Sequence, residues 1–295
     1  MKVISDVDEM RRFALASRKR GNDVALVPTM GALHAGHLSL LSLAREAAPV
    51  VIVSVFVNPS QFGPNEDFGR YPRDLAGDLK RLEEVDGVDA VFAPTVDDIY
   101  ANGVSSQVIR VVPRSLTDHL CGPFRPGHFE GVTTIVAKLF NSCMPTVAVF
   151  GRKDAQQFVI IRRMALDLNF GIEIVGGPTV REPDGLALSS RNKYLNEEAR
   201  AQATVLHDAV STAQRLILEG ESNPVAVVDA MKSCVALAPL ANLQYAEVVD
   251  GESLQPMSTL SGGDHVVAAV AVHFGETRLI DNVFERVPEN RRARR

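Results

Sequence analysis

The residues of this chain best suited to chemistry are two histidines, His34 and His37, with Gly36 between them. They follow an apolar run over residues 24–27 and a strand-breaking Pro-Thr-Met-Gly over 28–31, and they precede a leucine-rich run with a helical pattern over 38–48. This pattern predicts a buried strand, a loop and a helix, with both imidazoles at the start of the helix. A helix start offers N–H groups that favour anions, and glycine permits close approach. We therefore expect a phosphate-binding site here.

A structural interpretation competes with this one. His34 would cap the loop, and His37 would be a partly buried helix residue whose ring is satisfied by backbone groups. For an isolated pair of histidines we weigh the two interpretations equally, so other parts of the chain must decide between them.

The elements that position these residues follow a regular order. Strand-like runs at 24–27, 50–57, 90–93, 107–112, 146–150 and 172–175 alternate with helical runs at 6–19, 38–48, 74–85, 131–142 and 155–168. The run 50–57 is apolar without alternation, which is typical of a parallel strand buried on both faces. We predict a Rossmann-like, doubly wound, mostly parallel sheet in an α/β domain over residues 1–179.

The regular alternation of predicted strands and helices ends after residue 179. A polar loop over 180–192 is followed by helical stretches at 196–219 and 223–237 and by strand candidates at 244–249, 265–272 and 277–280. This order predicts a smaller C-terminal α+β domain over residues 180–295 with an antiparallel sheet.

Composition bounds the possible partners. The 295 residues are 46% hydrophobic and 23% charged, and the net charge of -5 argues against nucleic acid or an anionic membrane as the partner. The basic tail at 291–295 is expected to be a solvated terminus. The three cysteines have no metal-ligand spacing, and the chain begins without a signal-like apolar segment, so we expect a cytoplasmic protein with no protein-ligated metal.

More cations lie where a doubly wound sheet would bind a ligand, beyond the carboxyl ends of its strands. The segments 29–37, 58–61 and 151–157 each follow a predicted strand, and Lys153 lies in the last of them. Ser189, Ser190 and Arg191 lie on the polar loop. Lysine and arginine both bind phosphate oxygens, so these groups outline a triphosphate site. The sequence lacks the P-loop pattern, and no Gly-x-Gly-x-x-Gly follows a strand.

Five segments, in this order and spacing, resemble one family: VPTMGALHAGH (27–37), FVNPSQF (56–62), RPGHFEGV (125–132), FGRKDAQQ (150–157) and VREPDGLALSSRNKYL (180–195). They are similar to the pantothenate synthetases, the AMP-forming pantoate:β-alanine ligases of the His-x-Gly-His nucleotidyltransferase superfamily. The resemblance implies a reaction of pantothenate and coenzyme A biosynthesis. The carboxylate of (R)-pantoate attacks the α-phosphorus of ATP to give pantoyl adenylate and pyrophosphate, and the amine of β-alanine then displaces AMP to give pantothenate.

The resemblance also implies roles for residues at matching positions. His34, His37, Lys153, Ser189 and Arg191 would be catalytic, with His37 as proton donor, and Gln61 and Gln157 would bind pantoate. The ATP-binding residues would be Met30, Gly31, Ala32, Leu33, His34, Ala35, Gly36, His37, Gly151, Arg152, Lys153, Asp154, Val180, Leu188, Ser189, Ser190 and Arg191. His128 lies in a matching loop. Ser60, Arg152, Ala155 and Leu188 depart from residues common in the family.

The implied partners are small molecules: pantoate, β-alanine and ATP with Mg²⁺, the latter held mainly by phosphate oxygens and water. A homodimer is implied as well. Three alternatives are weighed: a nucleotidylyltransferase of the same superfamily that transfers AMP to another small acceptor, a nucleotide-binding module without turnover, and an RNA-aminoacylating enzyme. The short chain and acidic balance disfavour the last.

Overall fold

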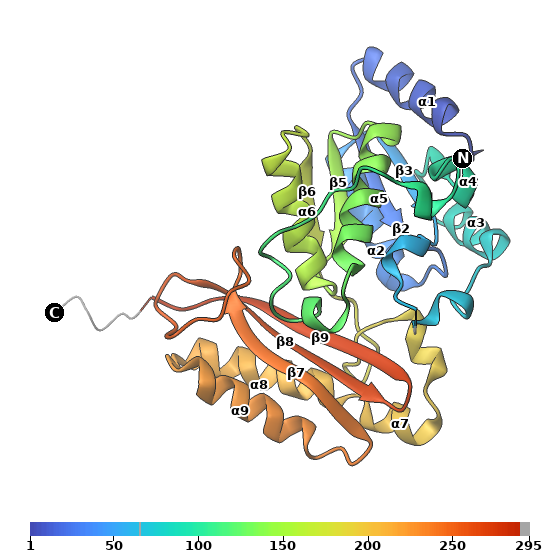
Figure 1. The fold of residues 1–295 in the computed structure, drawn as a ribbon. Helices are drawn as coiled ribbons and strands as arrows, with labels where there is room; N and C mark the ends of the chain where they lie inside the picture. Colours follow the sequence, from blue (N-terminus) through green and yellow to red (C-terminus); the bar gives the residue numbers. More distant parts are fainter. Residues whose placement is uncertain (65, 290–295) are drawn as a thin grey trace. The chain divides into compact units, whose positions relative to one another are not determined.

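The structure is a computed structural model that describes residues 1–64 and 66–289, so the predicted basic tail at 291–295 lies outside the described residues. A six-stranded parallel sheet has the order β1-β4-β3-β2-β5-β6. Figure 1 labels four of its strands, β3, β2, β5 and β6. Its strands are β1 (Lys2–Ile4), β2 (Val24–Thr29), β3 (Val50–Val55), β4 (Ala90–Phe92), β5 (Val147–Gly151) and β6 (Glu173–Gly177). The predicted parallel sheet is confirmed. Strand β1 was not predicted, because only three residues pair with β4.

Helices connect these strands: α1 (Val7–Lys19), α2 (Ala35–Ala47), α3 (Leu75–Glu83), α4 (Val96–Ile99), α5 (His128–Cys143) and α6 (Ala155–Asp167). Side-chain caps set where several of them begin. Asp6 accepts a hydrogen bond from the Glu9 N–H at the start of α1, and Asp74 accepts one from the Gly77 N–H at the start of α3. Single-turn 3-10 helices lie in the loops: η1 (Pro59–Gln61), η2 (Asp67–Gly69), η3 (Val104–Ser106), η4 (Gly122–Phe124) and η5 (Ser190–Tyr194).

Both faces of the parallel sheet are buried, as the apolar strands predict. Val27 and Val53 pack in one cluster with Leu40 of α2 and Leu82 of α3. Leu26 and Ile52 point to the opposite face, since side chains alternate along a strand, and they are equally inaccessible to solvent. The order of the strands reverses at β2, with β3 on one side and β5 on the other. Ligands bind at such a switch point in open α/β sheets.

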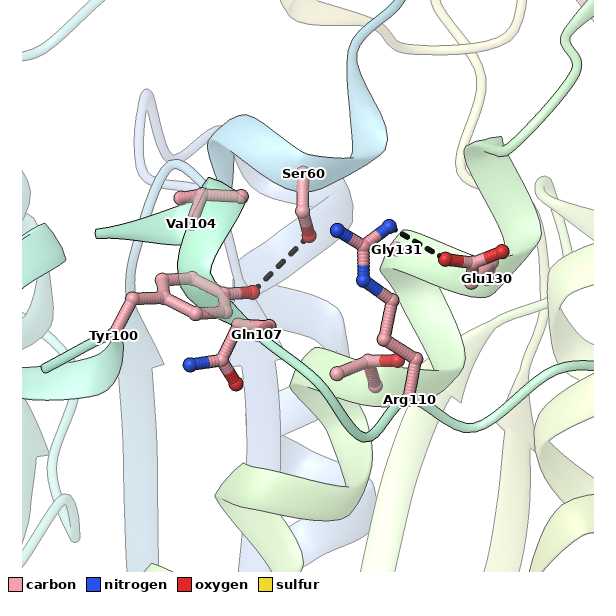
Figure 2. A pocket seen from close by; sticks show the side chains of 8 residues that line it. Ser60, Tyr100, Val104, Gln107, Arg110, Glu130 and Gly131 are labelled. Carbon is pink, nitrogen blue, oxygen red and sulfur yellow. Dashed lines mark hydrogen bonds and ion pairs between the residues drawn. The ribbon is translucent and has the colours of Figure 1, made fainter. Parts of the chain in front are cut away.

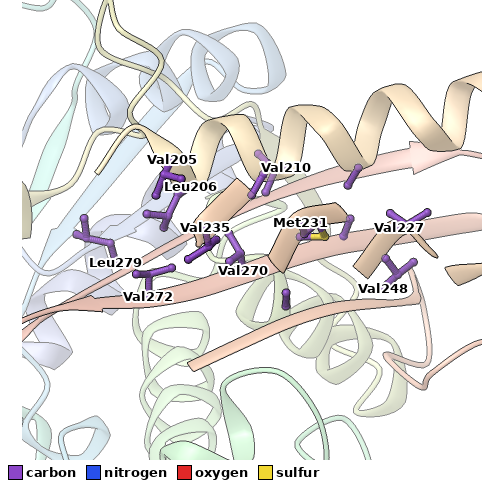
Figure 3. Close-up of a cluster of buried hydrophobic side chains, with 14 of the residues drawn as sticks. Val205, Leu206, Val210, Val227, Met231, Val235, Val248, Val270, Val272 and Leu279 are labelled. Atoms are coloured by element: carbon purple, nitrogen blue, oxygen red, sulfur yellow. The ribbon is translucent and has the colours of Figure 1, made fainter. Parts of the chain in front are cut away.

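The C-terminal part contains α7 (Glu197–Gln202), α8 (Val205–Glu219), α9 (Pro224–Val235), β7 (Ala241–Asp250), β8 (His265–Phe274) and β9 (Thr277–Arg286). The strands form an antiparallel sheet in the order β7-β8-β9, which confirms the predicted sheet. Val210 of α8, Met231 of α9 and Val270 of β8 pack in one apolar core (Figure 3). The predicted single helix over 196–219 is two helices, α7 and α8, separated by a turn at Ala203 and Thr204.

The strand predicted at 107–112 is wrong. Residues 107–113 have no regular secondary structure, and Val108 and Ile109 are 92% and 83% exposed. The threonines of α5 replace a neighbouring strand as hydrogen-bond partners: the Val111 N–H donates to Thr134 Oγ1, and Thr133 Oγ1 donates to the Val111 carbonyl. The backbone of this apolar run is therefore held by threonine side chains of α5, and the run exposes its own apolar side chains to solvent.

Contacts between residues divide the chain into two compact units. Unit 1 comprises Met1–Arg114, Arg125–Arg152 and Ile160–Val180 and holds the parallel sheet. Unit 2 comprises Ser115–Phe124, Lys153–Val159 and Arg181–Arg295 and holds the antiparallel sheet. Across residues 1–64 and 66–289, no helix combines the length and apolar character that crossing a membrane requires.

Candidate active site

In unit 1, the two histidines lie together at the N-terminus of α2. His34 is the N-cap residue, and its Nδ1 accepts a hydrogen bond from the Gly36 N–H at 3.1 Å. The Nδ1 of His37 accepts one from the His34 N–H at 3.3 Å, and the ring centroids are 4.1 Å apart. A neutral imidazole has one acceptor nitrogen and one N–H group. Because a backbone N–H can only donate, Nε2 carries the hydrogen in both rings.

These contacts unite the two interpretations of the sequence. The rings do satisfy backbone groups at the helix start through Nδ1, as the structural interpretation expects. Each ring then supplies an Nε2–H donor, the type of group that a phosphate oxygen requires.

A buried carboxylate shapes the loop before the histidines. Asp78 of α3 is 2% exposed, and its two oxygens accept hydrogen bonds from the N–H groups of Ala32 and Leu33 at 2.9 and 2.7 Å. Arg81 donates to the Leu33 carbonyl from the same helix. A Cβ added at Gly31, whose φ is +79°, would lie 2.8 Å from Asp78 Oδ2, so glycine fits both the close approach and the left-handed backbone.

Gln61 lies in η1, directly after β3, and is 8% exposed. Its Oε1 accepts a hydrogen bond from Asn58 Nδ2 at 3.0 Å, and its Nε2 donates to the sulfur of Met30 at 3.0 Å. Two residues that the resemblance assigns to pantoate and ATP, Gln61 and Met30, are thus in contact within unit 1.

A series of polar contacts, from Glu66 through Arg125 to His128, ends at the backbone of Gln61 and supports η1. Arg125 forms a bidentate ion pair with Glu66 at 2.7 and 2.6 Å, and its third nitrogen lies 2.9 Å from His128 Nε2. Arginine cannot accept a hydrogen bond, so His128 Nε2 accepts and Nδ1 donates to the Gln61 carbonyl at 2.7 Å. Burial acts to raise the pKa of Glu66, but the hydrogen bond and charge of Arg125 outweigh it and hold that pKa below 4.5.

Unit 2 carries two of the predicted cations, Lys153 and Arg191. Lys153 precedes α6, and its carbonyl accepts a hydrogen bond from Asn282 Nδ2 of β9 at 2.7 Å. Ser189 is the N-cap of η5, and its hydroxyl accepts from the Arg191 N–H at 3.2 Å. η5 also contacts β9, so both groups are attached to the same strand.

Three ion pairs hold the polar loop that leads to Ser189. Asp281 is 1% exposed and accepts two hydrogen bonds from Arg181 at 2.6 and 3.0 Å. Arg200 of α7 binds Glu182 and Asp184, each at 2.7 Å. The loop is therefore attached to both the sheet and the helices of unit 2.

The predicted site residues divide between the units. Unit 1 contains Met30, Gly31, Ala32, Leu33, His34, Ala35, Gly36, His37, Gln61, Gly151, Arg152 and Val180, and unit 2 contains Lys153, Asp154, Gln157, Leu188, Ser189, Ser190 and Arg191. Ala35, Arg152 and Asp154 are exposed, and Gln157 is half-buried in α6.

The supporting residues that sequence reasoning missed include Asp78, Asn58 and Asn282. Asn58 lies in the quoted segment FVNPSQF, and an asparagine before Pro59 at the end of a strand is a helix-capping signal. The Asp281-Asn282 pair inside a strand was a signal too, because polar residues are uncommon in a buried strand. Asp78 had no signal beyond its place in α3.

A family model and named relatives show which family this chain is similar to. The family model described as Pantoate-beta-alanine ligase matches residues 2–284. The pantothenate synthetase of Salinibacter ruber is 56% identical over 98% of this chain and 99% of its own length, and that of Moorella thermoacetica is 50% identical over 96% and 98%.

Solved structures agree. The chain is similar to the pantothenate synthetase of Thermus thermophilus, with a TM-score of 0.87 and 44% identity over 96% of this chain and 99% of that one. It is also similar to the pantoate-beta-alanine ligase of Francisella tularensis complexed with β-γ ATP and β-alanine, with a TM-score of 0.76 and 34% identity over 96% and 97%. The chain belongs to the pantoate–β-alanine ligase family.

Proposed function

We propose that this chain condenses (R)-pantoate with β-alanine at the expense of ATP, through the residues described above. In the first step a pantoate carboxylate oxygen bonds to the α-phosphorus of ATP, and the bond from that phosphorus to the pyrophosphate oxygen breaks. In the second step the amine of β-alanine bonds to the acyl carbon, AMP leaves, and the amine loses a proton. The observation that carries the proposal is the pair of Nε2–H donors at the start of α2, in a chain of this family.

His34 and His37 donate hydrogen bonds to phosphate oxygens of ATP in this proposal, and the bond from His37 stabilises the charge that develops as pyrophosphate leaves. The N-terminus of α2 adds its partial positive charge. Phosphoryl transfer depends on positioning and on stabilising charge that develops on phosphate oxygens, so donors that are already fixed in place are effective. The capping hydrogen bonds at Nδ1 supply that fixing.

Lys153, Ser189 and Arg191 hold the phosphates of the same ATP as pyrophosphate leaves. The backbone contacts of Lys153 with Asn282 and of Ser189 with Arg191 support this role, because they fix where each side chain begins. The remaining residues expected to bind ATP line the nucleotide through backbone and apolar groups.

Gln61 and Gln157 bind pantoate. An uncharged amide suits a substrate whose carboxylate has to remain nucleophilic, since a cation in direct contact would lower its reactivity. The contacts that fix Gln61 on both its backbone and its side chain support its role.

The second domain, over residues 180–295, closes on the bound substrates and protects the acyl adenylate from water. The ion pairs of Arg181 and Arg200 support this idea, because they make the loop bearing Ser189 and Arg191 move together with unit 2. Protease cleavage between residues 183 and 190 should slow when ATP is added. Equal cleavage with and without ATP would contradict closure.

Mg²⁺ enters with ATP, held by phosphate oxygens and water. Among residues 1–64 and 66–289, no group of three or more His, Cys, Asp or Glu side chains is arranged to hold a metal ion. We further propose that the protein acts in the cytoplasm as a homodimer. The exposed apolar side chains of Val108, Ile109 and Val112 support self-association through this segment.

The test is an AMP-release assay with each substrate omitted in turn. AMP and pantothenate should form only when ATP, pantoate and β-alanine are all present, and removal of Mg²⁺ with a chelator should stop the reaction. A nucleotidylyltransferase would instead release pyrophosphate with another acceptor and no β-alanine. That result would contradict the proposal.

A further inference from the structure

The side-chain amide of Asn58 is held in one orientation by its neighbours. Asn58 Nδ2 lies 3.2 Å from the carbonyl oxygen of Gly131, which can only accept, so this end of the amide must be the nitrogen. The other end, Oδ1, accepts hydrogen bonds from the hydroxyl groups of Tyr100 at 2.7 Å and Ser60 at 2.9 Å. Asn58 and Tyr100 are both 1% exposed.

This orientation sets the polarity of Gln61. Asn58 Nδ2 also donates to the Gln61 side chain at 3.0 Å, so the Gln61 atom that faces Asn58 must be the acceptor Oε1. The NH₂ group of Gln61 is therefore directed away from Asn58, towards the sulfur of Met30. A ligand that meets this NH₂ group must supply an acceptor, such as a carboxylate or hydroxyl oxygen.

We propose that Tyr100 and Ser60 are positioning residues for the ligase reaction, which act through Asn58 so that Gln61 presents N–H donors to an oxygen of pantoate. The inference rests on the proposed binding of pantoate by Gln61. Gln61 then contacts its substrate as a hydrogen-bond donor, although an amide that was free to rotate could equally present its oxygen as an acceptor.

The surroundings keep the two hydroxyl groups in place. The hydroxyl oxygens of Ser60 and Tyr100 lie 3.1 Å apart at the edge of a small cavity that Arg110 and Glu130 also line (Figure 2). Burial raises the pKa of Tyr100, and the neighbouring Ser60 hydroxyl and the charge of Arg110 offset this only in part, so the phenol stays protonated and can donate. A water molecule in the cavity could replace one lost hydroxyl group, so both must be removed in a decisive test.

The experiment measures kcat and the KM values for pantoate and ATP in Tyr100→Phe, Ser60→Ala, the double variant and Gln61→Ala. The double variant should raise the KM for pantoate about tenfold, the scale of one to two lost hydrogen bonds. Its KM for ATP should stay within about twofold of wild type, because Gln61 does not bind ATP. Added to Gln61→Ala, the two substitutions should cause no further loss in kcat/KM for pantoate.

Two controls remove buried hydroxyl groups elsewhere. Tyr245→Phe removes the phenol that contacts Cys121, and Ser17→Ala removes the hydroxyl that donates to the Phe13 carbonyl. Both should leave the KM for pantoate unchanged. Thermal unfolding of every variant shows whether the fold is kept.

The outcomes separate this inference from the proposed function. If Gln61→Ala raises the KM for pantoate but the double variant does not, the inference is overturned and the role of Gln61 stands. If the double variant's effect adds in full to that of Gln61→Ala, or falls equally on ATP, the hydroxyl groups act on the fold alone and the inference is again overturned. If Gln61→Ala leaves pantoate binding unchanged, both fail.

Discussion

Asp78 Oδ1 accepts a hydrogen bond from the Leu33 N–H at 2.7 Å, so a buried carboxylate of α3 holds the backbone next to His34. Its second oxygen holds Ala32 in the same way, at 2.9 Å. The loop that delivers both imidazoles to the start of α2 is therefore fixed by a residue 41 positions beyond His37 (78 − 37). A substitution at Asp78 should therefore alter the position of the two histidines without changing the histidines themselves.

Replacing Asp78 with Asn turns one of the two acceptor oxygens into an NH₂ group facing a backbone N–H. We expect a loss of about 1–3 kcal/mol in the free energy of unfolding, the cost of a buried donor without an acceptor. Turnover should fall on the order of tenfold, because the imidazoles lose their alignment. Denaturant unfolding and steady-state kinetics measure both effects. Asp86→Asn, at an exposed position of the next loop, is the control and should change neither.

Gly131→Ala should displace Gln61. A Cβ at Gly131 would lie 2.3 Å from the Ser60 carbonyl oxygen and 2.7 Å from the Gln61 nitrogen, so η1 would have to move. Alanine favours a helix by about 1 kcal/mol over glycine, but such overlap with backbone costs about 1–3 kcal/mol, so overlap should win. The KM for pantoate should rise about tenfold or more. Gly69→Ala, where a Cβ meets nothing within 4 Å, should bind pantoate as wild type does. An unchanged KM in Gly131→Ala would show that η1 does not position the substrate.

Glu66→Gln should weaken the fold in a pH-dependent way. The pKa of Glu66 is lower in the folded protein than its ordinary value of 4.5, so its ion pair with Arg125 stabilises the fold fully above that value. The contribution is lost as the pH falls through the folded pKa. Near pH 7 we expect the variant to lose about 1 kcal/mol, which corresponds to about 2–4 °C in the unfolding midpoint.

The midpoints of wild type and Glu66→Gln should converge as the pH is lowered, because the wild-type carboxylate becomes neutral too. Glu83→Gln, at an exposed position in α3, serves as the control for general effects of charge. A difference that stays constant into the acidic range would mean that the ionised carboxylate of Glu66 contributes nothing to stability.

Ile109→Asp should dissociate the proposed homodimer. The side chain is 83% exposed beside Val108, so it costs the single chain nothing to replace, whereas a charge in an apolar interface is unfavourable. Sedimentation at several concentrations should show dimers for wild type and monomers for the variant. Leu237→Asp, also at 83% exposure, should sediment as wild type. A variant that remains dimeric would place the interface elsewhere.

The sequence was most informative where a single apolar pattern indicated both that a strand is buried and how it is connected to its neighbours. Apolar runs such as 50–57 predicted the parallel sheet because only a strand covered on both faces is apolar throughout. The same reasoning failed at 107–112, since apolar composition cannot reveal that Thr133 and Thr134 take the place of a neighbouring strand. Strand β1 escaped because three residues are too few to form a pattern.

The types of residue that form the site could be predicted from the sequence, but the residues and hydrogen bonds that hold them in place could not. His34 and His37 stand out in the sequence, while the tautomer of each ring depends on the hydrogen bonds at Nδ1. Asp78 and Tyr100 lie far from the motifs that they support, and pairs so distant in sequence leave no local signal. A fold is needed to reveal such contacts.

The most direct test of the account is the single-turnover release of pyrophosphate from ATP and pantoate, with no β-alanine, by wild type and by His37→Ala. We predict that the rate falls a hundredfold or more in the variant, the scale for removing one preorganised donor. The affinity for ATP should change far less, and His265→Ala, at an exposed position of β8, should behave as wild type. A His37→Ala protein that releases pyrophosphate within about threefold of the wild-type rate would contradict the account, because the start of α2 would then not carry the adenylation step.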